Sequence, residues 1–261
     1  MTSSSSKPIL YSAWFCPYAQ RVWAGLHHFD VDFELIESLG SGMQPQYTKL
    51  PELLIANPKG LVPTLVYPNS KDIIKCESID ILKDLYQECT PQTEEELSKL
   101  YQEAILWNQK VCSPYYRVLV KPDQAGRRGG WNDMLAGLTA FSKLLRWEEI
   151  EGKTRAISFY DCKGNSQDGS KPSLVDFTVF PWIHRLCVIE EYRNFRLVDG
   201  VPGNVYEKIE SWTKKMEALP AVQKTLANRT VLIDSYKRYA DGVVQSKVGE
   251  AVRQGKEAHN I

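Results

Sequence analysis

The pattern of apolar residues changes near Pro91, and this change constrains the fold more than any other feature of the chain. Before Pro91, short β-prone runs alternate with patterns of helical spacing, in the order β-α-β, loop, β-β-α. After Pro91, helical spacing prevails and strand-like alternation is scarce. One helical pattern opens on the acidic residues before Leu97 and continues through Tyr101 and Ala104, and others cover residues 131–150, 173–192 and 205–219. We therefore predict an α/β domain over residues 7–90, followed by an all-helical domain over residues 95–261.

Composition excludes several classes of function. The 261 residues carry 32 basic and 32 acidic side chains, so no nucleic-acid partner is indicated. No apolar run approaches the roughly 18 residues of a membrane-spanning helix, and the N-terminus lacks the apolar segment of a signal peptide. The six cysteines form no CxxC pair and no cluster with histidines. This spacing argues against a disulfide framework and a metal site, and favours a reducing, cytoplasmic location.

Local signals place some boundaries within these domains. The turn-rich residues 68–72 predict an antiparallel hairpin. Flexible or turn-rich loops are expected at residues 39–45, 127–130 and 162–172, and a loosely docked helix after Tyr239. Ser173 and Asp176 form the S-x-x-D pattern of a capping box. The run that follows is too apolar for a surface, which predicts the central helix of the second domain.

The stretch "SAWFCPYAQR" places Cys16 where the first strand ends and the first helix begins. Pro17 then occupies the favoured first helical position. A thiol held at the positive end of a helix has a lowered pKa and is stabilised as a thiolate. The alternative is a small buried cysteine, which is the commonest state of a free thiol. Placement alone leaves both interpretations open.

Ala19 stands where the second cysteine of a CxxC dithiol would be. A mixed disulfide at Cys16 therefore has no neighbouring thiol to release it, and an external thiol must attack. This requirement points to a small-molecule thiol and predicts a nearby pocket for glutathione.

Two later stretches are suited to such a pocket. "NPKGLVPTL" puts Pro63 before a strand, where a cis Val62–Pro63 bond would present the Val62 backbone to an extended peptide; an ordinary proline at a strand start is the alternative. "KCESIDIL" puts Glu77 and Ser78 at a strand-to-helix junction. The start of a helix attracts a carboxylate at such a junction. The Glu77 carboxylate can accept a hydrogen bond from an α-ammonium group. Simple helix capping by Ser78 is the alternative.

These motifs, with "SLVDFTVFPWIHRL" and "IESWTKKMEALPAV", follow one another in an order that spans almost the whole chain. The chain resembles a cytosolic glutathione transferase of the omega class. The resemblance implies a thioredoxin-like N-terminal domain with the glutathione site, an all-helical C-terminal domain, and a homodimer. It also implies glutathione as the cosubstrate, with no metal, and a small hydrophobic or disulfide acceptor.

Carried over residue by residue, the resemblance makes Cys16 the nucleophile. The other residues implied to bind glutathione are Phe15, Pro17, Tyr18, Lys49, Val62, Pro63, Glu77 and Ser78. The family match at Lys49 is weak, because residues 38–56 depart from the family pattern in length. Trp182 and Arg185 match acceptor-pocket positions, although Trp182 fits equally well as part of the core.

The function implied is a glutathione-dependent thiol transferase or reductase that acts on small disulfides, dehydroascorbate or glutathionyl-ketones and quinones. A glutathionyl-hydroquinone reductase is an alternative, but that class carries Trp in place of Tyr18. A non-catalytic ligand carrier, or an intracellular-channel-like protein of the same fold, is the alternative outside enzymes. Cys76 and the histidines at 27, 28 and 184 are weaker candidates, for which packing or solvation is the simpler interpretation.

Overall fold

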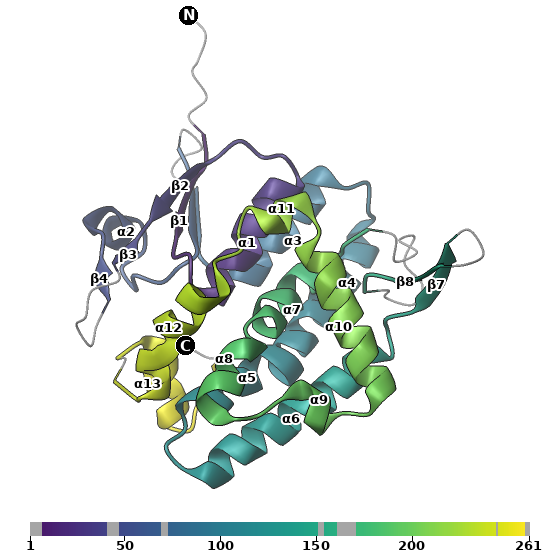
Figure 1. The fold of residues 1–261 in the computed structure, drawn as a ribbon. Helices are drawn as coiled ribbons and strands as arrows, with labels where there is room; N and C mark the ends of the chain where they lie inside the picture. The colour runs from purple at the N-terminus through teal and green to yellow at the C-terminus, as the bar shows by residue number, and fades with distance from the viewer. Residues whose placement is uncertain are drawn as a thin grey trace, which may run out of the picture. The chain divides into compact units, whose positions relative to one another are not determined.

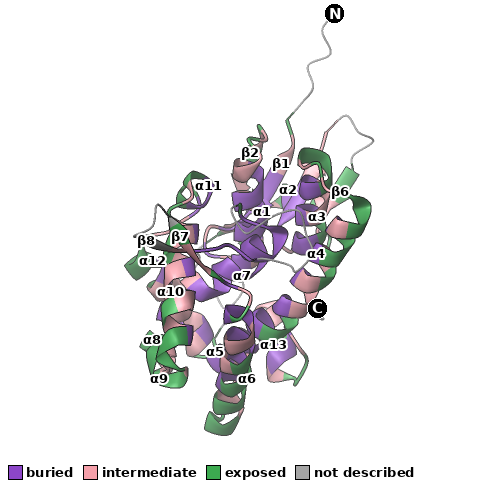
Figure 2. Cartoon of the chain, turned by 90° about the vertical axis from the view of Figure 1, so that its right-hand side faces the viewer, coloured by how far each residue is buried: buried purple, intermediate pink, exposed green. Residues whose placement is uncertain are grey.

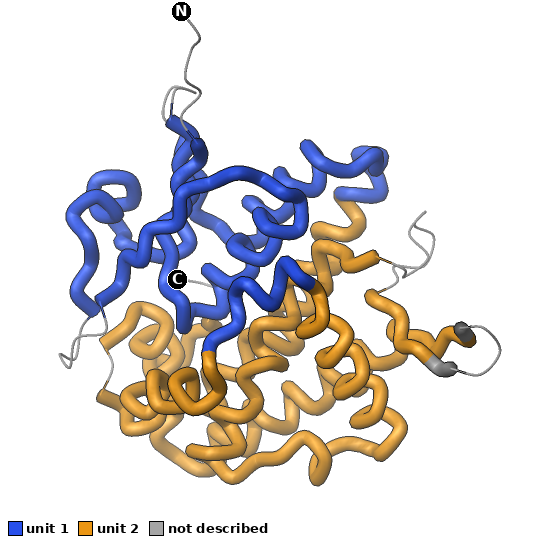
Figure 3. The backbone as a smooth tube through the Cα atoms, turned by 45° about the horizontal axis from the view of Figure 1, so that its top comes forward, with its two compact units in different colours: residues 1–97, 220–227 blue, residues 98–219, 228–261 orange. Residues whose placement is uncertain are grey.

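The computed structural model describes residues 7–40, 47–68, 73–150, 154–160, 171–243 and 245–258. The chain divides into two compact units: the first comprises residues 1–97 and 220–227, the second residues 98–219 and 228–261 (Figure 3). The sequence pattern assigned all of 95–261 to one domain, whereas residues 220–227 join the first unit. The side-chain amide of Gln20 donates to the Thr225 carbonyl at 3.3 Å and to its hydroxyl at 3.1 Å. These bonds tie the late segment to the N-terminal unit.

The first unit is built on a four-stranded mixed sheet with strand order β2-β1-β5-β6 (Figure 1). β1 pairs with β2 in parallel, and the β1–β5 and β5–β6 pairs are antiparallel. The strands are β1 Ile9–Ser12, β2 Glu34–Glu37, β5 Thr64–Tyr67 and β6 Ile73–Lys75. This is the predicted thioredoxin-like order of β-α-β followed by β-β-α. The turn at 69–72 lies outside the described residues.

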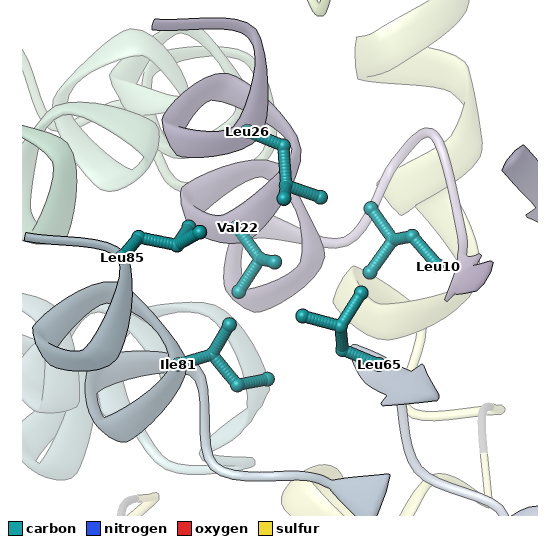
Figure 4. Packing of buried hydrophobic residues seen from close by; sticks show 6 residues of the cluster. All are labelled: Leu10, Val22, Leu26, Leu65, Ile81 and Leu85. Atoms are coloured by element: carbon teal, nitrogen blue, oxygen red, sulfur yellow. The ribbon is translucent and has the colours of Figure 1, made fainter. Parts of the chain in front are cut away.

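Two helices, α1 (Pro17–His28) and α3 (Ser78–Cys89), pack on this sheet. Between them lies a cluster of aliphatic side chains that are at most 1% exposed, Leu10, Val22, Leu26, Leu65, Ile81 and Leu85 (Figure 4). Burying each side chain contributes about 1.5–3 kcal/mol. Gly25 lies where the helices meet, because a Cβ there would come within 2.6 Å of Leu82 Cδ2. The core thus fixes α1 against α3.

The segment between β2 and β5 contains structure that the sequence pattern did not predict. β3 (Leu39–Gly40) pairs with β4 (Thr48–Lys49), and a short helix α2 (Pro51–Ala56) follows. The loop expected at 39–45 begins inside β3, and residues 41–46 lie outside the described part of the chain. A two-residue strand has no periodic pattern of its own, so its pairing depends on a distant partner.

The second unit is mainly helical, as predicted. Its helices are α4 Glu94–Trp107, a π-helix Asn108–Cys112, α5 Ser113–Val120, α6 Gln124–Ser142, α7 Leu174–His184, α8 Leu186–Arg193, α9 Leu197–Gly200, α10 Gly203–Glu217, α12 Arg229–Ala240 and α13 Lys247–Arg253. The first turn of α4 and the whole of α11 (Pro220–Gln223) belong to the first unit. The helix predicted after Tyr239 is α13. Among described residues, no helix is long and apolar enough to cross a membrane.

Two details of the second unit correct the sequence-based expectation. The helical pattern extended to residue 150, but β7 (Trp147–Ile150) and β8 (Thr154–Ile157) form an antiparallel hairpin. The loop expected at 127–130 lies inside α6. Gly130 suggested a turn, yet it serves close packing: a Cβ there would come within 2.9 Å of Arg117 Cβ on α5. Glycine thus permits two helices to approach.

α7 is the buried helix of this unit: every residue from Leu174 to Ile183 is buried (Figure 2). Its capping box is confirmed, since the Ser173 hydroxyl accepts from the Asp176 N–H at 3.4 Å and the Asp176 carboxylate accepts from the Ser173 N–H at 2.7 Å. That carboxylate also accepts from the Ser173 hydroxyl, the Tyr160 N–H and the Trp212 indole N–H. Burial raises the pKa of Asp176, and these hydrogen bonds oppose the rise.

Candidate active site

Cys16 is the residue that precedes the first turn of α1, and Pro17 is the first helical residue, as predicted. The Cys16 N–H donates to the Ala13 carbonyl at 2.9 Å, and its own carbonyl accepts from the Gln20 N–H at 3.0 Å. Cys16 therefore occupies the position from which a serine or aspartate usually caps the first turn, although its side chain makes no capping hydrogen bond. The helix dipole favours negative charge at this point.

The thiol is half-buried and faces the loop before β5. Cys16 Sγ donates to the Val62 carbonyl oxygen at 3.8 Å. The Val62–Pro63 peptide bond is cis, as predicted. Residues 46 positions apart in the sequence thus meet at one point, beside the start of a helix and the start of a strand.

A buried hydrogen-bond network, which the sequence analysis missed, holds this loop. The Asn57 side-chain amide donates to the Leu61 carbonyl at 3.3 Å and to the Thr64 hydroxyl at 3.0 Å. The Thr64 hydroxyl donates in turn to the Leu61 carbonyl at 2.8 Å. Asn57 and Thr64 lie at the two ends of "NPKGLVPT". This pair of polar residues on either side of the turn was the sequence signal from which the network could have been predicted. The network fixes the backbone on both sides of Val62.

Lys49 lies against the same loop, since its ammonium group donates to the Lys59 carbonyl at 3.2 Å. Gly60 makes this approach possible: its φ is +59°, and a Cβ would come within 2.6 Å of Lys49 Cδ. The sequence match at Lys49 was weak because of the unusual segment around it, which the structure resolves as β4 followed by α2.

Glu77 and Ser78 lie at the start of α3, as predicted, but Ser78 does not cap the helix. Glu77 is the residue before the first turn, and Ser78 is the first helical residue. The Ser78 hydroxyl instead accepts from the Arg21 guanidinium at 3.1 Å. Arg21 is 1% exposed and comes from α1. This contact, which sequence reasoning missed, joins the helix that begins at Cys16 to the helix that begins at Ser78, and Glu77 remains exposed.

The aromatic residues on either side of Cys16 differ in burial and in the side chains that they contact. Phe15 is buried and stacks on Tyr47, with 5.0 Å between ring centroids. Tyr18 is half-buried, with the Arg21 guanidinium 5.3 Å from its ring centroid. Just before Cys16, the Trp14 N–H donates to the Glu37 carboxylate at 3.0 Å. The turn that carries the thiol is therefore anchored to β2.

Other described cysteines have environments that oppose ionisation. Burial raises the pKa of Cys76 and Cys187, and also that of Cys89, although Cys89 is exposed overall. For Cys76, the neighbouring Glu77 charge adds to the rise, while a hydrogen bond from Thr64 opposes it. Cys162 lies outside the described residues. For Cys76, these surroundings favour the simpler interpretation, a partly buried thiol at the end of a strand, over a role in the site.

Trp182 and Arg185, the predicted acceptor-pocket residues, are buried in the second unit. Trp182 is 0% exposed, and Arg185 is 1% exposed. The Arg185 guanidinium donates to the Pro181 carbonyl at 2.7 Å and to the Tyr236 hydroxyl at 3.1 Å. Burial of this degree favours a packing role for both side chains. Their contact with an acceptor stays a prediction.

His184 is likewise engaged within the second unit. Its Nδ1 lies 2.8 Å from a Glu217 carboxylate oxygen, and its ring stacks on Phe180. In the first unit, His27 accepts from the Trp23 indole N–H at 3.1 Å, and burial lowers the pKa of His27. Both histidines thus have packing partners, in line with the simpler interpretation of the sequence.

The arrangement of the first unit is suited to thiol chemistry on an extended peptide. A sulfur at a helix start, the backbone of Val62 and the exposed carboxylate of Glu77 are joined through α1, β5 and α3. The positive ends of two helices favour anionic groups.

The chain is similar in sequence to known glutathione transferases. Residues 15–88 match the family model described as the N-terminal domain of glutathione S-transferases. The chain is 24% identical over 243 residues to a probable glutathione transferase omega-2 of Caenorhabditis elegans, covering 89% of this chain and 86% of the relative. It is 25% identical over 217 residues to glutathione S-transferase omega-1 of Sus scrofa, covering 82% and 78%.

The fold is also similar to that of a solved glutathione transferase. Glutathione transferase Omega 3C of Trametes versicolor superimposes with a TM-score of 0.65 at 22% identity, over 92% of this chain and 93% of the other. Both the N-terminal sheet with its helices and the helical C-terminal part are included in that coverage. The chain is therefore similar in sequence to omega-class glutathione transferases, and it has the glutathione transferase fold.

Proposed function

We propose that this protein is a glutathione-dependent thiol transferase in which Cys16 is the nucleophile. The observation that supports the proposal most is the position of the Cys16 sulfur, at the start of α1 and 3.8 Å from the Val62 carbonyl. Tyrosine or serine at this place would activate glutathione for conjugation, whereas a cysteine forms a disulfide with it. In the proposed reaction, glutathione is therefore held on the protein as a mixed disulfide with Cys16.

The reaction proceeds by two exchanges. The Cys16 thiolate attacks the glutathione sulfur of a glutathionylated acceptor; the new disulfide forms as the acceptor's disulfide breaks, and the acceptor leaves as a thiolate that takes a proton. A second glutathione thiolate then attacks the glutathione sulfur of that disulfide, so that glutathione disulfide leaves and the Cys16 thiolate returns. Ala19 offers no thiol for an internal second step, so the external glutathione is required.

The proposed glutathione site uses the residues around this sulfur. The Val62 backbone pairs with the cysteinyl part, Glu77 accepts from the γ-glutamyl ammonium, and the start of α3 at Ser78 attracts the γ-glutamyl carboxylate. Arg21 supports this by fixing the Ser78 hydroxyl. Lys49, held beside the loop by the Lys59 carbonyl, supplies a positive charge for the glycyl carboxylate. Small disulfides and dehydroascorbate are the proposed acceptors, in a cytoplasmic setting.

A pair of cysteine variants tests the proposal. We expect Cys16→Ser to lower glutathione-dependent reduction of a small disulfide by at least about a hundredfold, because a serine hydroxyl cannot form the mixed disulfide. Cys76→Ser removes another half-buried thiol of the same unit and should leave the rate within about twofold, since burial holds Cys76 in its thiol form. Retention of the activity by Cys16→Ser would refute the proposal.

A further inference from the structure

A cavity of about 870 Å³ lies in the second unit, between α6 and the segment that runs from the end of α8 through α9. Four arginines line it, at positions 127, 128, 193 and 196, against two carboxylates, Glu191 and Asp199. We call it the arginine pocket. Every lining residue belongs to the second unit, and neither Cys16 nor a proposed glutathione contact is among them.

Arg127 and Arg128 are placed where positive charge is locally unfavourable. They lie in the first turns of α6, which begins at Gln124 after the capping residue Asp123. The positive end of the helix dipole repels cations there. Arg127 is half-buried and lines the cavity, and its Nε donates to the Lys121 carbonyl at 2.6 Å.

Arg193 adds a charge that neutral carbonyl groups hold in place. Its guanidinium donates to the carbonyls of Leu119, Tyr192 and Ala240. Burial lowers the pKa of Arg193, the neighbouring Arg127 charge adds to the effect, and the Asp241 carboxylate opposes it. Like charges are therefore close enough here to repel one another.

Arg196 differs from the other three, because its guanidinium lies 3.1 Å from Glu190 and 3.8 Å from Asp199. Within the described residues, no carboxylate lies within ion-pair distance of Arg127, Arg128 or Arg193. With four arginines against two carboxylates, the lining of the pocket thus carries an excess of positive charge.

An aromatic pair holds Arg128 in position. Asn194 ends α8 in the left-handed conformation with φ 57°, which turns the chain so that Phe195 stacks on Trp131 at 5.5 Å between centroids. The Arg128 guanidinium lies 4.6 Å from the Phe195 centroid. Such stacking restricts the guanidinium while its N–H groups stay available at the edge of the plane.

We propose that the arginine pocket binds a small organic anion, whose phosphate or carboxylate group is held by Arg127 and Arg128. The planar guanidinium matches both groups with paired N–H···O bonds. A bound anion would also compensate the repulsion between Arg127 and Arg193 and the unfavourable position at the start of α6. The volume lies within the range of small-molecule sites, about 300–1,000 Å³.

Calorimetric titration of the full-length protein with pyrophosphate and with citrate, at constant ionic strength, tests this proposal. We expect saturable binding of at least one probe at one site. Arg127→Gln and Arg128→Gln should each weaken it about tenfold, the loss of one charge-assisted contact. Lys214→Gln removes the same charge from a side chain that is 68% exposed on α10 and outside the pocket, and should leave the affinity unchanged.

The probes separate the two sources of the anion. If only pyrophosphate binds, the ligand carries a phosphate group; if only citrate binds, it carries a carboxylate group. If both bind, the pocket accepts an oxyanion of either kind. Circular dichroism verifies the fold of each variant; should the half-buried Arg127 prove necessary for it, exposed Arg128 carries the test. Absence of saturable binding for both probes, or equal affinity in Arg128→Gln and the parent, would overturn the proposal. Cys16-dependent disulfide reduction should be the same in all variants.

Discussion

The residue that precedes the first helical turn differs in its contacts between α1 and α7. At α7, Ser173 and Asp176 satisfy each other's backbone N–H groups, and the carboxylate accepts four hydrogen bonds from Ser173, Tyr160 and Trp212. At α1, Cys16 occupies the same capping position, but its side chain makes no capping hydrogen bond and donates to the Val62 carbonyl instead. Sulfur is a weak acceptor as a thiol and a strong one as a thiolate. The first arrangement stabilises the fold, and the second is the one on which the proposed nucleophilic role of Cys16 rests.

The largest effect expected from this comparison concerns Asp176. Asp176→Ala should destabilise the protein by about 3 kcal/mol, because it leaves buried donors from three residues without an acceptor. Chemical unfolding followed by circular dichroism measures the change. Asp133→Ala is the control: Asp133 is 58% exposed and pairs with Arg117 on the surface, so its loss should cost at most about 1 kcal/mol. Equal costs for the two variants would contradict the role given to Asp176.

Selective alkylation compares Cys16 with the other thiols. At pH 7, we expect iodoacetamide to label Cys16 at least about tenfold faster than Cys76 or Cys89, because the raised pKa values of those two leave little thiolate at that pH. Their labelling should increase only as the pH rises above the ordinary thiol range, about 8.5. Peptide mapping after timed labelling gives the rates. Cys89 is exposed, so faster labelling of Cys16 would not reflect access alone.

A smaller effect is expected at the capping serine. Ser173→Ala should destabilise the protein by about 1 kcal/mol, since the Asp176 N–H loses its acceptor while the carboxylate keeps its backbone partner. Denaturant midpoints of Ser173→Ala and of Ser246→Ala, the equivalent change at α13, give the comparison. No loss of stability in Ser173→Ala would show that the box does not stabilise α7.

The smallest effect should have the opposite sign. Cys16→Ser introduces a good capping oxygen at the start of α1, and we expect it to raise stability by about 0.5 kcal/mol while activity is lost. The same unfolding measurement, made on the reduced parent protein, detects the change. A clear loss of stability would indicate that Cys16 is a packing residue of the first unit.

Features that depend on neighbouring residues were predictable from the sequence. The Cys16–Pro17 helix start, the capping box at Ser173 and the hairpin of β5 and β6 follow from local patterns. The cis Val62–Pro63 bond was expected from its position and from the family resemblance, and the structure has it; the roles of the site residues stay predictions. Prediction therefore succeeded where a short segment determines its own conformation.

Features that depend on distant partners were not predictable. Ser78 resembled a helix cap, but it bonds to Arg21, which is 57 positions away. The hairpin of β7 and β8 follows a helical pattern without a break in periodicity, and Thr225 joins the first unit through Gln20, 205 positions away. Gly130 suggested a loop because its packing role depends on α5. In each case, tertiary contacts decide the outcome.

Mass analysis of the protein after exposure to glutathione disulfide tests the central claim most directly. We predict one glutathione adduct per chain, located on the peptide that contains Cys16 and absent from Cys16→Ser. Added glutathione should release this adduct, because Ala19 provides no internal thiol for the second exchange. An adduct on another cysteine, or one at Cys16 that excess glutathione leaves in place, would contradict the account.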